Sequence, residues 1–175
     1  ARSELVEALC TMGIHTPNAV QAEALPIALQ GDDMLLLAPT GSGKTLAFGI
    51  PLVAMTSKGS PRRPTSLVLS PTRELADQIA SEIKSLTQST SITTVYGGVA
   101  YGKQVNALKY GTDILVACPG RLEDLMESGT VVLDHIERVV IDEADRMADM
   151  GFLPAVRRIL DATTSRTQTI LFSAT

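Results

Sequence analysis

Short apolar runs of strand length alternate along the chain with segments whose apolar residues recur at helical spacing. Most of these runs are apolar at both alternating positions, which is typical of strands covered on both faces of a parallel sheet. The predicted strands are Met34–Ala38, Ser66–Ser70, Ile92–Tyr96, Asp113–Ala117, Arg138–Asp142 and Thr169–Phe172.

The segments between the runs predict helices. The clearest one carries Leu75, Ile79, Ile83 and Leu86, whose spacing by whole helical turns puts them on one face. Strands and helices that alternate in this way predict an α/β fold with a mostly parallel central sheet and helices on both faces. The predicted helices are Glu4–Cys10, Ala19–Leu29, Lys44–Met55, Arg73–Thr87, Tyr101–Tyr110 and Arg121–Ser128.

Two segments are expected to lie outside these elements. Residues 56–65 are rich in Gly, Ser and Pro, so we expect a surface loop there. Met147, Phe152 and Leu153 are expected to pack under the segment that follows the carboxylates at positions 142–145.

Composition limits the class of protein. The chain has 175 residues, of which 45% are hydrophobic and 19% charged, so it can form one folded domain. Cys10 and Cys118 lie far apart without zinc-ligand spacing, which argues against a disulfide scaffold or structural zinc and favours a reducing compartment. No apolar run approaches the ~20 residues of a membrane span. We therefore expect an intracellular, cytoplasmic protein that does not contact a membrane.

Charge and aromatic content restrict how the chain could bind nucleic acid. Fifteen basic and 19 acidic residues give a net charge of −4, so no global positive field attracts a polyanion. Aromatic residues make up only 3% of the chain and include no Trp, which leaves little material for stacking bases. Any nucleic-acid contact should therefore be local and directed at the backbone.

The first candidate site is a phosphate cradle between a predicted strand and a predicted helix. Its spacing is that of a P-loop, with Ala38 where the usual pattern has Gly. Glycines let backbone N–H groups curve around phosphate oxygens, and the helix N-terminus adds a favourable dipole. Lys44 would reach the β- and γ-phosphates, and the Thr45 hydroxyl would ligate Mg²⁺. The candidate residues are Ala38, Pro39, Thr40, Gly41, Ser42, Gly43, Lys44 and Thr45.

A carboxylate cluster, residues 142–145, follows the fifth predicted strand. By itself such a string is also typical of a solvated turn, but beside a P-loop Asp142 is a candidate Mg²⁺ ligand. Glu143 could then orient or deprotonate an attacking water. Gln21 has the donor and acceptor that adenine's N6 and N7 edge requires, although a solvated helix glutamine is the plain alternative. Because the chain has no Asn-Lys-x-Asp string for guanine, we predict ATP as the nucleotide.

Further motifs follow the ends of predicted strands, which a parallel sheet gathers at one edge. Pro71-Thr72-Arg73 and Pro119-Gly120-Arg121 open predicted helices, where N-termini and arginines suit phosphodiester oxygens. Gly97 and Gly98 allow a backbone to approach closely. Ordinary helix starts with solvated arginines remain an equal alternative for either arginine motif taken alone.

Asp142-Glu143-Ala144-Asp145 spells DEAD, and the whole chain resembles the first RecA-like domain of DEAD-box RNA helicases. Gly13, Pro17 and Gln21 resemble the family's Q motif. The segment Ala38–Thr45 resembles motif I, Pro71–Leu75 motif Ia and Cys118–Arg121 motif Ib. Gly97-Gly98 is similar to the GG motif and Ser173-Ala174-Thr175 to motif III. The chain departs from the family at Ile14, usually aromatic, at Asn18, usually Thr or Ser, and at Cys118, usually Thr.

The resemblance implies specific roles for these residues. ATP and Mg²⁺ would be the cofactors, with Lys44 and Glu143 catalytic and Thr45 and Asp142 at the metal. Asp145, Ser173 and Thr175 would couple hydrolysis to the RNA site. Single-stranded RNA would be bound through its backbone, with little sequence specificity. The implied RNA-binding residues are Pro71, Thr72, Arg73, Gly97, Gly98, Pro119, Gly120 and Arg121.

We expect residues 1–175 to form a single RecA-like ATP-binding domain of a longer protein, because the sequence stops directly after an apolar strand. A second RecA-like domain, absent here, would be its partner within the same protein. Two rival functions stay open: a P-loop ATPase that acts on DNA or protein, and a non-catalytic RNA-binding or scaffold module. Comparing ATP hydrolysis stimulated by RNA with that stimulated by DNA in the longer protein would test the first rival. The second would be favoured only if Lys44 and Glu143 proved dispensable for function.

Overall fold

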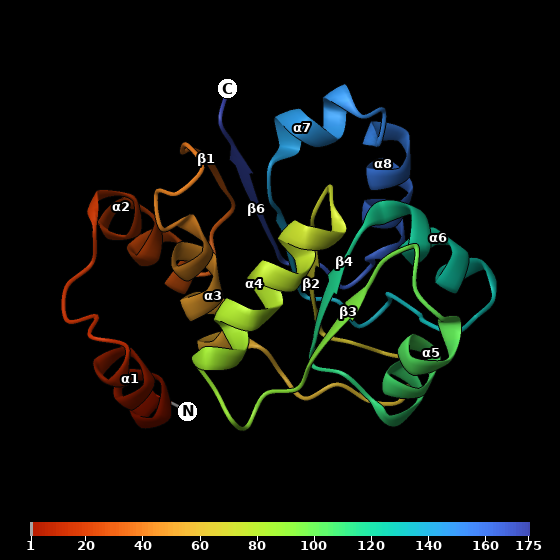
Figure 1. Ribbon diagram of the computed structural model, residues 1–175, viewed down its shortest axis with the longest axis horizontal. Helices are drawn as coiled ribbons and strands as arrows, with labels where there is room; N and C mark the ends of the chain where they lie inside the picture. The colour runs from red at the N-terminus through yellow and green to blue at the C-terminus, as the bar shows by residue number, and fades with distance from the viewer. Residues whose placement is uncertain (1) are drawn as a thin grey trace.

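The computed structural model describes the chain from residue 2 to residue 175. Within these residues six strands form one sheet in the order β1-β6-β5-β2-β4-β3. All of the pairings are parallel (Figure 1). The predicted α/β fold with a parallel sheet is therefore confirmed. The strands are β1 (Met34–Leu37), β2 (Ser66–Leu69), β3 (Ile92–Val95), β4 (Ile114–Ala117), β5 (Arg138–Ile141) and β6 (Gln168–Ser173).

Helices cover both faces of the sheet, as predicted. Helices α1 to α4 share one hydrophobic core with the sheet, and α5 to α8 share the other (Figure 1). One face carries α1 (Arg2–Thr11), α2 (Ala19–Leu29), α3 (Lys44–Met55) and α4 (Arg73–Ser85). The other carries α5 (Tyr101–Tyr110), α6 (Pro119–Glu127), α7 (Ala144–Asp149) and α8 (Leu153–Ala162).

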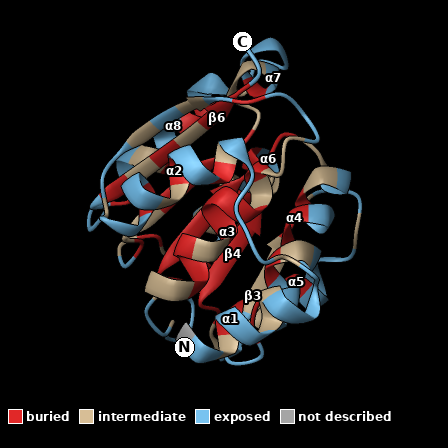
Figure 2. Cartoon of the chain, turned by 90° about the vertical axis from the view of Figure 1, so that its left-hand side faces the viewer, coloured by how far each residue is buried: buried red, intermediate tan, exposed pale blue. Residues whose placement is uncertain are grey.

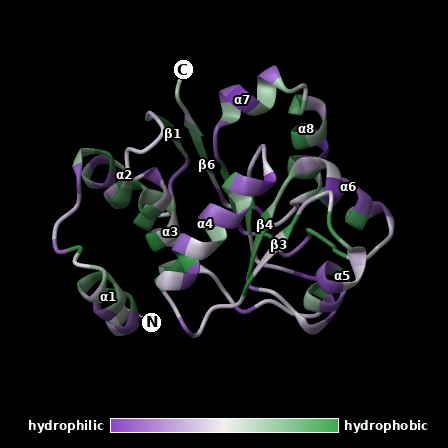
Figure 3. Ribbon diagram, in the orientation of Figure 1, coloured by the Kyte–Doolittle hydropathy of each residue, from purple (hydrophilic) through white to green (hydrophobic). Residues whose placement is uncertain are grey.

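The central strands supply side chains to both cores because successive residues point to opposite faces. Val68 and Val116 belong to the core under α3 and α4, whereas Leu67 and Leu115 belong to the core under α5 and α6. All four side chains are fully buried. Figure 2 shows the central strand β4 and much of α3 as buried, with exposed residues on the outer sides of the helices. Hydropathy follows the same division, with hydrophobic residues along β4 and β6 and hydrophilic stretches on α5, α6 and α7 (Figure 3).

Strand β1 is an exception to the prediction of strands covered on both faces. Leu35 and Leu37 on one of its faces are 68% and 65% exposed, because β1 is an edge strand whose residues alternate between partly buried and exposed. Its sole strand neighbour among the described residues is β6, the last strand, with Met34 opposite Ile170 and Leu37 opposite Ser173.

The segment after the carboxylate cluster differs from the prediction. It forms two helices, α7 and α8, that the apolar pattern did not identify. Met147 is fully buried, as expected, but Leu153 is 49% exposed at the start of α8, where Ala155, Val156 and Ile159 are buried instead. The expectation that Leu153 packs under this segment was therefore wrong.

The loop at residues 56–65 is tied closely to the sheet. Asp113 accepts hydrogen bonds from the backbone N–H groups of Gly59 at 2.7 Å and Ser91 at 2.9 Å, and pairs with Lys58 at 3.0 Å. A Cβ at position 59 would lie 1.9 Å from the Thr112 carbonyl oxygen, so only Gly fits there. Among the helices of residues 2–175, none has both the length and the apolar character of a membrane span.

Candidate nucleotide and nucleic-acid site

The P-loop joins β1 to α3 at the carboxyl edge of the sheet. Gly41 and Gly43 have φ angles of 80° and 79°, a region in which glycine is free of the strain that other residues meet. Gly43 is the N-cap of α3 without a side-chain cap, so the first N–H groups of the helix stay available to an anion. A Cβ on Gly43 would lie 2.5 Å from Asn18 Nδ2 and 3.0 Å from Gln21 Nε2, so a larger residue would displace these two amides from the loop.

Lys44 connects this loop to the carboxylates after β5. Its Nζ lies 3.1 Å from Asp142 Oδ1 and 3.8 Å from Glu143 Oε1. The three side chains are 7%, 0% and 12% exposed, so their charges are largely removed from water. Burial raises the pKa of the Asp142 carboxyl, and the Lys44 ammonium opposes that shift. The structure thus joins the predicted phosphate-binding lysine to the predicted metal ligand and the predicted base.

The residues present fit a nucleotide with a hard cation. Asp142 Oδ2 and Ser42 Oγ are buried without a hydrogen-bond partner among the described residues, so each can still accept or donate one bond. Residues 2–175 contain no group of three or more Asp, Glu, His or Cys side chains that would hold a metal ion. A site with few protein ligands suits Mg²⁺, which is commonly bound by one or two carboxylates together with substrate phosphates.

Glu143 has an unusual backbone conformation for a non-glycine residue. Its φ of 51° and ψ of 53° lie in the left-handed region, at the N-cap of α7. This conformation costs of order 1–3 kcal/mol and is often found where a side chain must be aimed at a ligand. The Glu143 N–H donates to Asp142 Oδ1 at 3.0 Å, and Arg146 lies 3.5 Å from the Glu143 carboxylate.

The segment before α2 is built against the P-loop. Asn18 and Gln21 form a capping box, in which the Gln21 N–H donates to Asn18 Oδ1 at 2.9 Å and the Asn18 N–H donates to Gln21 Oε1 at 3.0 Å. Asn18 Nδ2 donates to the Ser42 carbonyl at 2.9 Å, and Gln21 Nε2 donates to the Gly43 carbonyl at 3.2 Å. Gln21 therefore supports the phosphate cradle directly, and the predicted adenine contact remains a prediction.

Two residues near this loop were not identified as functional by sequence. Asn18, noted there only as a departure from the family, supplies the cap and a P-loop contact, which an N-cap residue three positions before a Gln could have indicated. Glu82 on α4 is half-buried, accepts a hydrogen bond from Gln78 Nε2 at 3.5 Å and lies near the Thr45 side chain. Burial raises the pKa of this carboxyl. Nothing in its sequence position distinguishes it from a surface glutamate.

The predicted RNA-binding motifs also come together. The Arg73 guanidinium lies 5.2 Å from the centre of the Tyr96 ring, and a Cβ on Gly98 would be 3.9 Å from Arg73 Nη1. Arg121 lies 4.4 Å from the centre of the Tyr101 ring and donates to Gln104 Oε1 at 3.2 Å. The loop at Gly97 and Gly98 is thus flanked by two arginines held over aromatic rings.

The two helix starts in this group are capped differently. Thr72 Oγ1 accepts a hydrogen bond from the Leu75 N–H at 3.3 Å at the start of α4. Pro119 and Gly120 form the first turn of α6, which therefore begins two residues before the predicted Arg121; its N-cap, Cys118, makes no side-chain cap bond. Burial, together with the carboxylates of Glu74 and Asp77, raises the pKa of the Cys118 thiol to about 11. This thiol is therefore protonated near neutral pH.

The residues predicted to couple the two sites contact one another after β5 and β6, the strands next to β1 in the sheet. Thr175 Oγ1 donates to Asp145 Oδ2 at 3.1 Å, and Ser173 Oγ donates to the Thr175 carbonyl at 2.8 Å. Although burial acts to raise it, hydrogen bonds from the Arg146 backbone and the Thr175 side chain hold the pKa of Asp145 below its usual value. The end of β6 is thereby tied to the first turn of α7.

The parallel sheet, the P-loop and the paired carboxylates define a nucleotide-binding domain of the RecA-like class. A family model described as DEAD/DEAH box helicase matches residues 18–175. The chain belongs to the DEAD/DEAH box helicase family.

Similar proteins and structures agree with this assignment. DEAD-box ATP-dependent RNA helicase 5 of Oryza sativa subsp. japonica is 48% identical over 95% of this chain and 34% of its own length. ATP-dependent RNA helicase-like protein DB10 of Nicotiana sylvestris is 44% identical over 99% of this chain and 29% of its own length. A crystal structure of a hypothetical ATP-dependent RNA helicase from Sulfolobus tokodaii matches with a TM-score of 0.92 and 41% identity, over 100% of this chain and 51% of that one. A crystal structure of a DEAD box protein from Methanococcus jannaschii matches with a TM-score of 0.90 and 37% identity, over 98% of this chain and 47% of that one. The chain thus spans about a third of the length of these curated relatives.

Proposed function

We propose that this chain is the ATP-binding half of an ATP-dependent RNA helicase, in which hydrolysis is coupled to RNA binding and local duplex unwinding. The observation that carries the proposal is the position of Lys44, buried at the P-loop and 3.1 Å from Asp142 at the end of β5. The Lys44 ammonium contacts the buried carboxylates of Asp142 and Glu143 and lies beside free helix N–H groups. In this position it can bind an incoming anion in place of one of those carboxylates. The phosphates of ATP are the anion that this loop fits.

The chain's own residues would divide the work of phosphoryl transfer. Lys44 and the N–H groups at the start of α3 would bind the phosphate oxygens. Thr45 and Asp142 would hold Mg²⁺, which neutralises phosphate charge when it is bound. Glu143 would orient the attacking water and accept its proton at the carboxylate.

The RNA strand would lie across the loops after β2, β3 and β4. Its phosphates would meet Arg73, Arg121 and the N-termini of α4 and α6. Recognition would be of the backbone, because few aromatic side chains are available to stack on bases. The contact between Asp145 and Thr175 would link this surface to the nucleotide.

A second RecA-like domain in the same protein would complete the site. Phosphoryl transfer gains roughly 10³–10⁵ in rate from an arginine that reaches the developing charge. The arginines in the motifs here, Arg73 and Arg121, lie on the proposed RNA side.

We place the protein inside the cell, in the cytoplasm, since Cys10 and Cys118 are both free thiols.

A turnover assay tests the proposal. The chain alone should bind ATP but hydrolyse it poorly with or without single-stranded RNA, whereas a protein that joins it to a second RecA-like domain should be stimulated by RNA and not by DNA of the same sequence. In that longer protein Glu143→Gln should keep ATP affinity and lose turnover by roughly 10²-fold or more. Equal stimulation by DNA would favour the DNA-dependent rival, and wild-type turnover of Glu143→Gln would remove Glu143 from the mechanism.

A further inference from the structure

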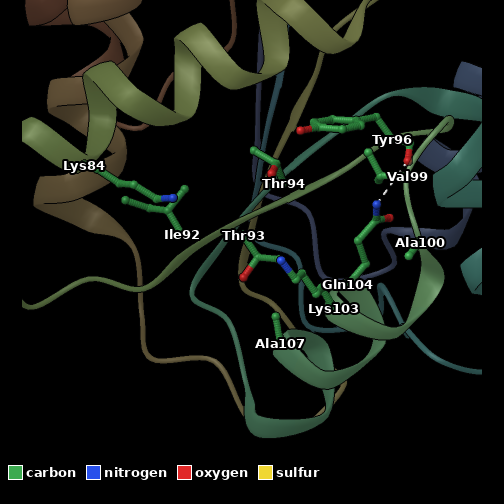
Figure 4. A pocket seen from close by; sticks show the side chains of 10 residues that line it. All are labelled: Lys84, Ile92, Thr93, Thr94, Tyr96, Val99, Ala100, Lys103, Gln104 and Ala107. Atoms are coloured by element: carbon green, nitrogen blue, oxygen red, sulfur yellow. Dashed lines mark hydrogen bonds between the residues drawn. The ribbon is translucent and has the colours of Figure 1, made fainter.

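The free edge of β3 forms the floor of a groove that borders the predicted RNA-binding loop at one end and extends away from it along the strand. Strand β3 forms one edge of the sheet, and β1 forms the other edge. The groove beside it has a volume of about 470 Å³ and is bounded by α4 on one side and α5 on the other (Figure 4). Its lining includes Lys84, Ile92, Thr94, Lys103 and Ala107.

Within residues 2–175, the backbone groups on the outer edge of β3 face this groove without a strand partner. The carbonyls of Ser91 and Val95 accept bonds from Ile114 at 3.0 Å and Cys118 at 2.9 Å, so these residues of the parallel ladder face β4. Alternation then turns the N–H and C=O groups of Ile92 and Thr94 outward, towards the groove. Alternating donors and acceptors at this spacing match the backbone of another extended peptide.

The two walls of the groove suit the side chains of an added strand. Ile92 packs on the core of α1 to α4 and Val95, three residues later, in the core of α5 to α8, so β3 side chains alternate between the two sides of the edge. A strand laid beside β3 would place its own side chains alternately against α4 and α5. This is the position that a seventh strand would occupy in the sheet.

The charge of the groove specifies the chemistry of its occupant. Figure 4 shows Lys84 reaching from α4 towards Ile92, and Lys103 reaching from α5 towards Thr93. Neither lysine has an ion-pair partner within residues 2–175, and the lining residues include no Asp or Glu. The N-terminus of α5 follows Ala100 of the lining and adds partial positive charge. In a chain of net charge −4, this groove is locally positive.

We propose that the β3 groove binds an extended, acidic segment of a partner protein, which adds to the sheet as a strand beside β3. RNA fits the groove less well, because a phosphodiester offers only acceptors to the alternating backbone groups. This proposal does not depend on the activity proposed above.

The test uses synthetic peptides and the whole chain. The probe is a peptide of about ten residues with alternating Glu and Val, and its matched control has Lys in place of each Glu. The acidic peptide should bind in fluorescence anisotropy, and the basic one should not. In hydrogen exchange followed by NMR, the bound acidic peptide should slow the amides of Ile92 and Thr94 by about tenfold or more, since strand addition gives both a carbonyl partner.

Two variants and a control locate the effect. Lys84→Glu with Lys103→Glu should weaken acidic-peptide binding by about tenfold at low salt. Lys109→Glu, also exposed on α5 but outside the groove, should leave binding unchanged. Thr94→Pro removes an outward N–H while sparing the bonds to β4, and should also weaken binding.

Several outcomes would overturn the proposal. Equal binding of the basic peptide, or binding without slower exchange at Ile92 and Thr94, would exclude strand addition directed by the lysines. Single-stranded oligouridine that competes with the acidic peptide and depends on the same lysines would assign the groove to RNA. No binding of any probe would mean that Lys84 and Lys103 only protect a sheet edge from self-association.

Discussion

The two groups of candidate residues at the carboxyl edge of the sheet hold their charges in opposite ways. At the nucleotide corner Lys44 and Asp142 are 7% and 0% exposed and are paired with each other. On the proposed RNA side Arg73 is exposed and Arg121 is partly exposed, and each is held over an aromatic ring. Buried charges that lose a partner are costly, whereas exposed ones are not. Substitutions of the charged residues in the first group should therefore affect folding and binding together, and substitutions of the two arginines in the second group should affect mainly binding.

The largest effect should come from Lys44→Ala. The free energy of unfolding should fall by about 3 kcal/mol, because Asp142 is left buried without its cation. ATP affinity should fall by roughly 30–100-fold through the loss of a charge-assisted contact. Calorimetry measures the ATP affinity, and denaturant unfolding measures the free energy of unfolding.

Two controls sharpen this prediction. Lys44→Met with Asp142→Asn removes both charges and should recover most of the stability but none of the ATP affinity. Arg121→Ala, on the RNA side, should cost less than about 1 kcal/mol. A Lys44→Ala variant that unfolds like the wild type would contradict the contrast between the two regions.

An intermediate effect is expected at Glu143, whose strained backbone is independent of its charge. Glu143→Gly should be more stable than Glu143→Ala by about 1 kcal/mol, because only glycine accepts a φ of 51° without cost. Both variants should lose turnover in a protein that carries the second domain. Arg62→Gly is the matched control: Arg62 has a φ of 65° outside the site, so this variant should gain stability and keep turnover. Equal stability of the two Glu143 variants would show that the backbone stores no strain.

The smallest effects should appear at the two helix starts of the RNA side. Thr72→Ala should cost about 1 kcal/mol by removing the cap of α4. Cys118→Thr should add roughly 0.5–1 kcal/mol by giving α6 the side-chain cap that it lacks. Thermal unfolding of both variants checks the pair, and a destabilised Cys118→Thr would mean that the thiol's packing outweighs the missing cap.

The sequence predicted the sheet and six of the helices because their apolar residues recur with the periods of strand and helix. It missed α7, which has only six residues, too few to establish a period. It also missed α8, although Pro154 followed by buried Ala155, Val156 and Ile159 carries a recognisable pattern. Exposure of Leu35 and Leu37 was not predictable, since it depends on which strand lies at the edge.

The candidate site was predicted as a set of residues but not as a geometry. Motif spacing identified Lys44, Asp142 and Glu143, and the carboxyl ends of parallel strands indicated that they would meet. The left-handed backbone of Glu143 and the contact of Gln21 with the Gly43 carbonyl come from tertiary packing, which local sequence does not encode. The same is true of Glu82, which approaches Thr45 only because α4 packs on α3.

The pairing of the first strand with the last has a consequence for synthesis of the protein. Because β1 has β6 as its strand neighbour, the strand that leads into the P-loop stays unpaired while residues 38–167 emerge from the ribosome. Pairing β1 with β6 brings together segments more than a hundred residues apart, and the chain loses conformational entropy when this loop closes. This loss slows folding. The backbone edge of β1 that pairs with β6 stays open during that interval, so a growing chain offers an unpaired strand edge to chaperones or to neighbouring chains. The nucleotide site of this domain is therefore one of its last parts to form.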